Sequence, residues 1–289
     1  MALTLAESAK LATDMVQAGV METIIKEEHV LDQLPFIEVV GNNFVFNRLN
    51  TEPAISFFAV GDTWTESTPD FTQLSVQLKI LGGDADVDNF IQSTRVNVQD
   101  QEAAVVQQKA KALARKWADT FINGDIASDS KSFDGIDKIC AGLPASQTVS
   151  MGVNGGTLTL ARLDELIDGV KTKNIALIMS RRSRRTLQGL VRTSGAALES
   201  RPGNFLEWVQ MYNGVPIFIN DYISDAKTVG TSTDCSTVYC FSMGEPDQGV
   251  VGLSAPGTVQ VERIGDLETK DATRHRVKWY SAIAVLSTL

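Results

Sequence analysis

Residues 101–124 read QEAAVVQQKAKALARKWADTFING and carry the most regular pattern in the chain. Their apolar side chains recur at intervals of four, three, four and four residues, which places them on one face of a helix. These side chains are Val106, Ala110, Leu113, Trp117 and Phe121. Asp100 is a candidate N-cap, and Gly124 is a candidate left-handed C-terminal cap. The pattern predicts a helix over 100–123, about 35 Å long, that can carry the rest of the fold.

Upstream of this helix, residues 36–81 have the composition of β-structure. Val39, Val45 and Phe46 favour strands, and the apolar residues from Leu74 to Ile80 alternate with polar ones. Between them, TEPAISFFAVGDTWTESTPDF (51–71) is rich in turn-forming residues. We therefore predict a long hairpin with an aromatic, acidic tip near 52–69. Because an isolated two-stranded ribbon is marginal in water, we expect a neighbouring subunit to supply the apolar surface that it lacks.

The remaining segments predict an arm at the N-terminus and a compact unit in the second half. Residues 3–28 have the apolar spacing of an amphipathic helix that ends before Pro35. Residues 157–248 alternate between helix and strand, which predicts a compact α/β unit. The expected elements are a helix over 160–170, a strand over 174–179, a basic helix capped by Ser180, a helical turn over 205–211, and strands over 215–219 and 237–241. Residues 250–264 and 274–286 predict strands that return to pack on the long helix.

Composition excludes several classes of protein. The 289 residues are 43% hydrophobic and 21% charged, as expected for a globular chain with a core. We find no apolar run of about 18 residues and no signal peptide, so we expect a cytoplasmic protein without a membrane span. Three cysteines without a CxxC pair are expected to be reduced. The net charge of -9 argues against binding nucleic acid through its phosphates, but not against enclosing it.

Few residues are suited to catalysis or metal binding. His29 and His275 are far apart, and no HExxH, GxSxG or P-loop motif occurs. Ser128 and Lys131 match SxxK without its companion motifs. Asp84, Asp86 and Asp88 have the spacing of a calcium loop, but Asn89 and Arg95 occupy the positions that need Gly and Glu. We favour a solvated turn or helix cap there, and we expect no enzymatic activity, cofactor or metal.

Two clusters are candidates for contacts between subunits. The basic cluster at 181–185 suits DNA phosphates, a localisation signal or a neighbour's carboxylates, and we favour an exposed or interface role. Trp64 with Phe57 and Phe58 forms either a local mini-core of the hairpin or an attachment point on an adjacent subunit, and the sequence favours neither. The candidate interface residues are Glu52, Phe57, Phe58, Asp62, Trp64, Glu66, Arg181, Arg182, Arg184 and Arg185.

In segment order and in several runs, the chain resembles the major capsid proteins of tailed phages, which have the Hong Kong 97 fold. The runs are LPFIEVVGNNFVFNR (34–48), VGDTWTESTPDFTQ (60–73), LKILGGDADVDNFIQ (78–92), AKALARKWADTFINGD (110–125), NIALIMSRRSRRTLQGLVR (174–192) and NGVPIFINDYI (213–223). The resemblance covers essentially the whole chain. It implies an α+β fold with an N-terminal arm (1–35), an extended loop (36–81), a peripheral domain with a spine helix (82–156), an axial domain (157–248) and returning strands (249–289).

By the same resemblance, the function is structural. Pentamers and hexamers of the chain would form the icosahedral head that encloses double-stranded DNA, assembled in the host cytoplasm and retained in the virion. Some family members join subunits through a lysine near the loop tip, but the only lysine in 36–81 is Lys79 at the base, so we expect non-covalent cohesion. Because no long scaffolding segment precedes the arm in this sequence, we expect either a separate scaffolding protein or a segment removed before this numbering begins. A portal and a decoration protein are further candidate partners. An encapsulin-like nanocompartment and a soluble α/β enzyme are the alternatives.

Overall fold

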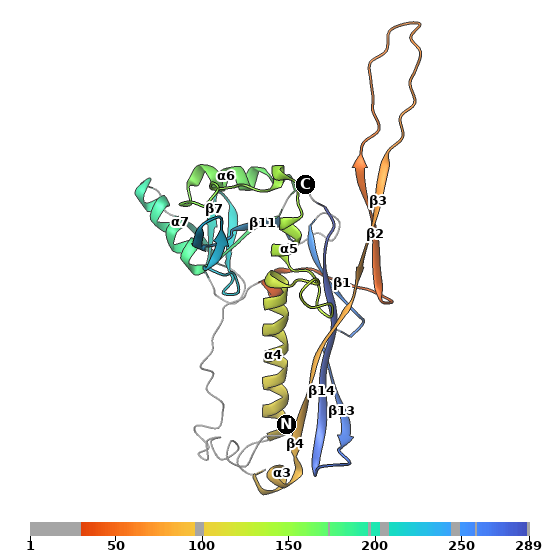
Figure 1. The fold of residues 1–289 in the computed structure, drawn as a ribbon, viewed down its shortest axis with the longest axis vertical. Coiled ribbons are helices and arrows are strands. Elements are labelled where there is room, and N and C mark those ends of the chain that lie inside the picture. Colours follow the sequence, from red (N-terminus) through yellow and green to blue (C-terminus); the bar gives the residue numbers. More distant parts are fainter. Residues whose placement is uncertain are drawn as a thin grey trace.

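The computed structural model describes residues 30–95, 101–172, 174–195, 198–202, 208–243, 249–257 and 259–287. The predicted N-terminal helix, the candidate cap Asp100 and His29 lie outside these residues. Figure 1 shows an elongated molecule in which a long helix and a long sheet run side by side. A smaller sheet with two helices lies at one end, and a narrow ribbon projects beyond it.

The predicted long helix is confirmed as α4 (Gln101–Asn123), and it packs against a five-stranded sheet. The strands are β1 (Phe36–Glu38), β4 (Lys79–Asp88), β12 (Val250–Ser254), β13 (Gln260–Asp266) and β14 (Ala272–Val285). Strand β14 pairs in antiparallel fashion with β4, β12 and β13, and β1 runs parallel to β12. Trp117 of α4 stacks on Trp279 of β14, with ring centroids 5.4 Å apart. The C-terminal strands therefore return to the long helix, as predicted.

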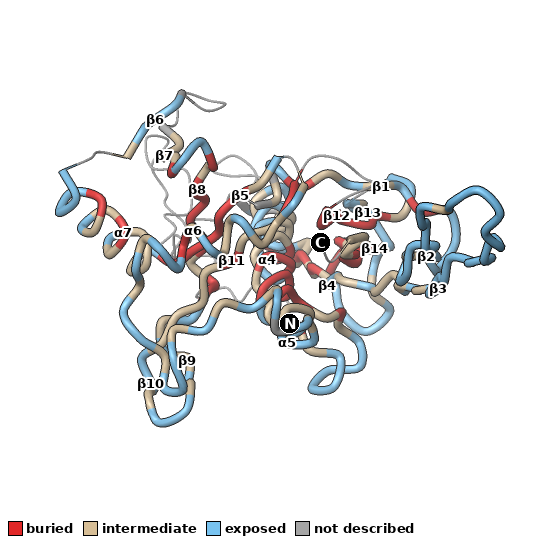
Figure 2. The backbone as a smooth tube through the Cα atoms, turned by 90° about the horizontal axis from the view of Figure 1, so that it is seen from above, coloured by how far each residue is buried: buried red, intermediate tan, exposed pale blue. Residues whose placement is uncertain are grey.

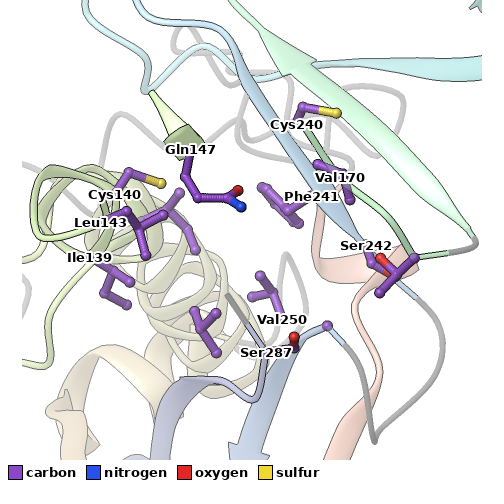
Figure 3. Close-up of a pocket in the computed structure, with 14 residues that line it drawn as sticks. Ile139, Cys140, Leu143, Gln147, Val170, Cys240, Phe241, Ser242, Val250 and Ser287 are labelled. Carbon is purple, nitrogen blue, oxygen red and sulfur yellow. The ribbon is translucent and has the colours of Figure 1, made fainter. Parts of the chain in front are cut away.

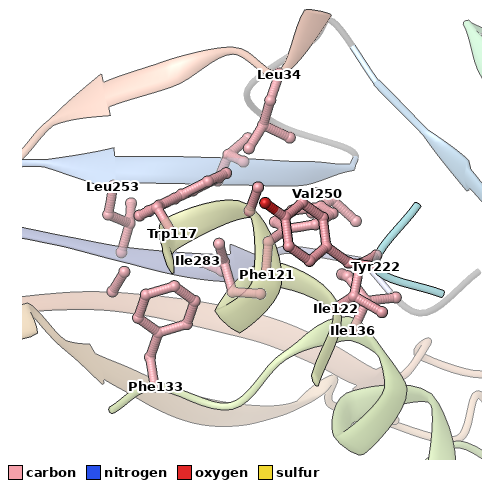
Figure 4. Packing of buried hydrophobic residues seen from close by; sticks show 14 of the residues in the cluster. Leu34, Trp117, Phe121, Ile122, Phe133, Ile136, Tyr222, Val250, Leu253 and Ile283 are labelled. Atoms are coloured by element: carbon pink, nitrogen blue, oxygen red, sulfur yellow. The ribbon is translucent and has the colours of Figure 1, made fainter. Parts of the chain in front are cut away.

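The core of this part is aromatic, and Figure 4 shows Trp117 and Phe121 projecting from α4 into it. Both side chains are fully buried, and their rings stack with centroids 5.4 Å apart. Phe36 of β1 closes the cluster at 5.7 Å from Trp117. Truncation of such a buried aromatic side chain typically costs about 3 to 5 kcal/mol. Short helices complete this part: α2 (Val30–Gln33), α3 (Asn89–Arg95), α5 (Ile136–Ala141) and a 3-10 turn over Ala145–Gln147.

The predicted left-handed cap at the end of α4 is wrong. Gly124 does not have a positive φ angle, although several other glycines of the chain do. Its missing side chain serves packing instead, because a Cβ there would collide with the carbonyl oxygen of Phe133 and lie 2.6 Å from that of Thr120. The chain returns so closely that the Gly135 N–H donates to the Gly124 carbonyl oxygen at 2.8 Å. The helix therefore ends where the backbone needs room for a second segment.

The compact α/β unit has its own sheet, in the order β11 (Tyr239–Ser242), β5 (Ile175–Met179), β8 (Val215–Ile219), β7 (Trp208–Tyr212) and β6 (Glu199–Pro202). Leu177 and Met179 face α6 (Leu160–Asp168) and α7 (Arg181–Thr193), in a core with Leu163 and Leu187. Ala176 and Ile178 of the same strand belong to the core of α4 instead. The two faces of one buried strand thus join the two parts of the molecule. A two-stranded hairpin, β9 (Lys227–Val229) and β10 (Ser232–Cys235), extends from this unit.

The predicted helical turn over 205–211 is also wrong for residues 208–211, which belong to strand β7, whereas 205–207 lie outside the described residues. Its antiparallel partner β8 follows a two-residue turn at Asn213 and Gly214. These residues have φ angles of 48° and 79°, the positive values of a type I′ hairpin turn. The dipeptide Asn-Gly between two apolar runs was the signal for this hairpin. The predicted strands over 174–179, 215–219 and 237–241 correspond to β5, β8 and β11, and the predicted helix over 160–170 ends at Asp168.

The predicted hairpin is present as β2 (Asn43–Thr51) and β3 (Asp70–Gln77), which pair in antiparallel register. Val39 and Ile80, however, lie outside this hairpin. Val39 directly follows β1, Ile80 lies in β4, and the strands β1 and β4 belong to the large sheet. We call residues 43–77 the ribbon, residues 52–69 its tip, and the other described residues the body. Figure 2 shows the ribbon exposed along almost its whole length at one side of the molecule, while buried positions gather around α4 and the two sheets.

Candidate subunit interface

The two faces of the ribbon differ because side chains alternate along a strand. Phe44, Phe46 and Val76 lie on the inner face, are partly buried and pack against the core of the body. On the outer face, Val45, Leu49 and Phe71 remain 48%, 46% and 60% exposed. Leu49 pairs directly with Phe71 across the two strands. The base of the ribbon is thus held by the body on one side only, and the other side presents apolar groups to solvent.

The tip is exposed, yet its backbone follows a defined course. The Ala59 N–H donates to the Asp62 carboxylate at 2.6 Å, and the Asp62 N–H donates back to the Ala59 carbonyl oxygen at 3.2 Å. Gly61, with a φ of 98°, completes this turn. The Ala54 N–H donates to the Ser67 hydroxyl across the base of the tip at 3.0 Å. Such local hydrogen bonds reduce the conformational entropy that a docking event must remove.

The tip combines acidic and apolar side chains. Glu52, Asp62 and Glu66 are its charged residues, and Arg48 is the single basic residue of the whole ribbon. Trp64 stacks on Phe58 with ring centroids 4.5 Å apart, yet it remains 78% exposed. Phe57 is fully exposed and does not join this pair. The hypothesis of a mini-core formed by all three aromatic residues is therefore wrong.

Exposed apolar residues are concentrated at this tip. Ile55, Phe57, Val60 and Trp64 each have at least 78% of their surface exposed. Full burial of a large apolar side chain stabilises a complex by roughly 1.5 to 3 kcal/mol. A partner that covers these four side chains therefore gains several such contributions. Large apolar side chains that are exposed on one short segment commonly mark an interaction site.

In the basic cluster at 181–185, Arg181 and Arg182 pair with acidic side chains of the same subunit. Arg181 donates to both carboxylate oxygens of Asp221, at 2.8 and 3.3 Å. Arg182 lies 3.5 Å from the Asp225 carboxylate and also donates to the Asp234 carbonyl oxygen. Arg185 is exposed, and the Nε of Arg184 is buried without a hydrogen-bond acceptor among the described residues. Two of the four arginines are therefore used to hold α7 on its own unit.

The candidate calcium residues lie in a strand and not in a loop. All three belong to β4, and Asp88 at its end accepts hydrogen bonds from the N–H groups of Phe90 and Ile91 at 2.9 and 3.2 Å. The helix-cap interpretation is thus confirmed for Asp88, and the solvated turn is wrong for the other two. Among the residues that the structure describes, no group of histidine, cysteine and carboxylate side chains is placed to hold a metal ion. In the same part of the chain, no helix is long and apolar enough to cross a membrane.

An apolar cavity of about 70 Å³ lies where α5, β11 and the C-terminal strands meet (Figure 3). Cys140 and Cys240 line it. Burial raises the pKa of the Cys140 thiol to about 11 and that of the Cys240 thiol to about 12. Both thiols are therefore protonated at neutral pH, so neither has the thiolate form that acts as a nucleophile.

His275 is the one histidine among the residues that the structure describes. Its side chain is buried in β14, and its Nε2 lies 3.1 Å from a carboxylate oxygen of Glu102.

One residue of this region was missed in the sequence. Arg48 follows Phe44 and Phe46 on the inner face of β2, and its guanidinium donates to the main-chain carbonyls of Val285 and Leu286. The available signal was a charged residue in an alternating apolar series. Its partners, however, are backbone atoms more than two hundred residues away, which no side-chain pattern reveals.

Comparison with known proteins identifies the fold. No family model and no curated protein matches the sequence. A chain of the holo-SrpI encapsulin complex from Synechococcus elongatus PCC 7942 matches with a TM-score of 0.74 at 18% identity, covering 99% of this chain and 93% of that chain. The capsid of a native GTA particle matches with a TM-score of 0.69 at 13% identity, covering 98% and 96%. A chain from Mycobacterium phage Adephagia matches with a TM-score of 0.61 at 15% identity, covering 99% and 92%.

These matches cover nearly the full length of this chain and of each matched chain. The chain has the α+β Hong Kong 97 fold that phage capsids and encapsulins share. At 13 to 18% identity, the likeness establishes the fold and not the function.

Proposed function

We propose that this chain is a structural shell protein whose copies form pentamers and hexamers of an icosahedral phage head around double-stranded DNA. The observation that carries the proposal is the ribbon, which exposes Trp64, Phe57 and the outer face of β2 and β3 although the body has a complete core. A neighbouring copy that covers this apolar surface gives it the burial that it lacks. Contacts of roughly 1,000 to 2,000 Å² per pair, repeated around each subunit, make a closed shell stable.

We assign each segment of the chain to one part of the shell subunit. Residues 1–35 form the arm, 82–156 the peripheral domain, 157–248 the axial domain around the capsomer axes, and 249–289 the returning strands. Residues 36–81 hold the extended loop, which is narrower than these bounds because β1 and the start of β4 belong to the large sheet and the ribbon covers 43–77. The tip carries the candidate contacts Glu52, Phe57, Phe58, Asp62, Trp64 and Glu66. Of the basic cluster, Arg184 and Arg185 are the candidates for a neighbour's carboxylates, since Arg181 and Arg182 already have acidic partners in their own subunit.

The charge of the molecule suits a container. A net charge of -9 gives little attraction to phosphate, so the shell encloses DNA without gripping a particular sequence. Its location is the virion, after assembly in the host cytoplasm. Its partners, besides its own copies, are a separate scaffolding protein, a portal and a decoration protein. No enzymatic activity is proposed.

An encapsulin-like nanocompartment shell is the second candidate. The observation that supports it is the shared fold, because an encapsulin chain matches this chain over nearly its full length, as the GTA and Adephagia chains do. Both candidates use the same surfaces between subunits, and they differ in what the shell contains.

Negative-stain electron microscopy of the purified full-length chain tests the shared claim. Closed round particles of uniform size are expected, whereas a monomer that persists at high concentration would contradict a shell. Particles isolated from the native source then separate the candidates. Nuclease-protected DNA is expected inside a phage head, whereas enclosed protein without DNA would favour the nanocompartment.

A further inference from the structure

The ribbon leaves the body at Arg48. Before this residue, Phe44 and Phe46 pack against the core, and after it residues 49–57 are exposed without interruption. On the returning strand, residues 70–73 are likewise exposed, and packing resumes with Val76. Arg48 is thus the outermost point at which the inner face of β2 meets the body, and the direction of everything beyond depends on this point.

The contact at this point is a pair of hydrogen bonds. Arg48 Nη2 donates to the Val285 carbonyl oxygen at 2.8 Å, and Nε donates to the Leu286 carbonyl oxygen at 3.3 Å. Among the residues that the structure describes, no other hydrogen bond joins the ribbon to the body. The accepting segment is itself fixed, because the Leu286 N–H donates to the Gly249 carbonyl oxygen at 3.1 Å. The ribbon is therefore tied to the end of the strand that packs on α4.

The chemistry of this contact requires arginine. The guanidinium is partly buried, and desolvation lowers its pKa, although it stays protonated because the ordinary value is so high. It also lies over the Phe46 ring, 6.0 Å from the centroid. A planar fork reaches two adjacent carbonyl oxygens at once, whereas a lysine ammonium offers one compact point of charge. The two bonds therefore restrain orientation as well as distance.

We propose that Arg48 is a positioning residue that sets the direction of the ribbon relative to the body, so that the tip reaches a second copy in the geometry that a shell needs. The second part of this proposal, contact with another copy, rests on the proposed function. The first part, the direction of the ribbon, is a property of one subunit and can be measured without assembly.

The test measures the direction of the ribbon in the unassembled full-length chain. Nitroxide labels at Thr63→Cys and Lys131→Cys, in a Cys235→Ser background, report the distance between the tip and the body by pulsed electron resonance. Cys140 and Cys240, which are only partly buried, are replaced by alanine in the same background, so that the two introduced thiols alone carry labels. We expect Arg48→Ala to broaden the distance distribution roughly twofold or more, with Arg48→Lys in between, because the outer ribbon loses its last fixed contact.

Asn47→Ala, on the exposed outer face of the same strand, is the matched control and should leave the distribution unchanged. If Arg48→Ala prevents folding, the distance distribution of Arg48→Lys alone tests the proposal, because this variant keeps the positive charge and loses only the planar fork. A distribution in Arg48→Lys as narrow as in the original chain would overturn the proposal, whether or not the protein forms shells. Absence of particles from the original chain would instead contradict the proposed function and leave the distance result intact.

Discussion

At the scale of single residues, strand register places opposite charges together on β4 and β14. Asp86 lies opposite Arg274, and Asp84 lies opposite Arg276. Arg274 donates to both carboxylate oxygens of Asp86, at 2.6 and 2.8 Å, and Arg276 does the same to Asp84, at 2.7 and 3.0 Å. Hydrogen bonds from these arginines hold the pKa of each carboxyl below its ordinary value. The alternation of aspartates that resembled a calcium loop is therefore one half of a cross-strand charge ladder.

This ladder predicts a pH dependence of stability. Because the pKa of Asp86 is lower in the folded state than in the unfolded chain, its carboxylate stabilises the fold above the ordinary value near 4. That contribution is lost as the pH falls through the folded value. We expect Asp86→Asn to lower the unfolding temperature at pH 7 by about 3 °C, with a difference from the original chain that shrinks between pH 4 and pH 2.

Thermal unfolding followed by circular dichroism across this pH range measures the effect. Glu268→Gln, at an exposed turn position between β13 and β14, removes the same charge and is the control. A gap between Asp86→Asn and the original chain that stayed constant down to pH 2 would show that the ion pair is not its cause.

At the scale of elements, the end of α4 depends on the absence of one side chain. A Cβ at Gly124 would collide with the Phe133 carbonyl oxygen, so Gly124→Ala forces the segment over 124–135 away from the helix. We expect a loss of about 2 to 3 kcal/mol in the free energy of unfolding, measured by denaturant titration. Gly189→Ala is the matched control, because a Cβ at this exposed position in α7 meets nothing within 4 Å. It should stabilise by roughly 0.5 to 1 kcal/mol. Equal losses in both variants would contradict the packing argument.

Elements with a long regular period were predictable, and those defined by distant pairing were not. The stripe from Val106 to Phe121 identified α4 because a helix satisfies its own hydrogen bonds. The apolar run 215–219 identified β8, but its partner β7 was missed because a short segment before it fits helix and strand alike. The partners of β1 and β4 lie in β12 and β14, about two hundred residues away, and the sequence gives no register for them. The aromatic tip was predictable from its composition, whereas the hold of Arg48 on backbone carbonyls was not.

At the scale of the whole molecule, the body is self-sufficient. One apolar core joins Trp117 and Phe121 of α4 to Ile178 and Tyr239 of the smaller sheet. Polar contacts support the same junction: the Tyr239 hydroxyl donates to the Asp137 carboxylate at 2.7 Å, and Lys227 also pairs with Asp137. Burial, followed by this carboxylate, raises the pKa of Tyr239, so its hydroxyl stays a donor at neutral pH. Folding of the subunit therefore needs nothing from the ribbon tip, which leaves the tip available for contacts between subunits.

This separation of folding from assembly predicts the effect of Trp64→Ala. Because Trp64 is 78% exposed, its loss should leave the unfolding temperature of the subunit within about 1 °C. If a neighbouring copy buries the ring, each contact loses about 2 kcal/mol, and the concentration needed for shell formation should rise roughly tenfold or more. Sedimentation of closed particles against free subunits measures this threshold. Val153→Ala, at an apolar position of the body that is 90% exposed, should change neither quantity. An unchanged threshold in Trp64→Ala would remove the tip from the interface, and a matching fall in subunit stability would place Trp64 in a fold-supporting role.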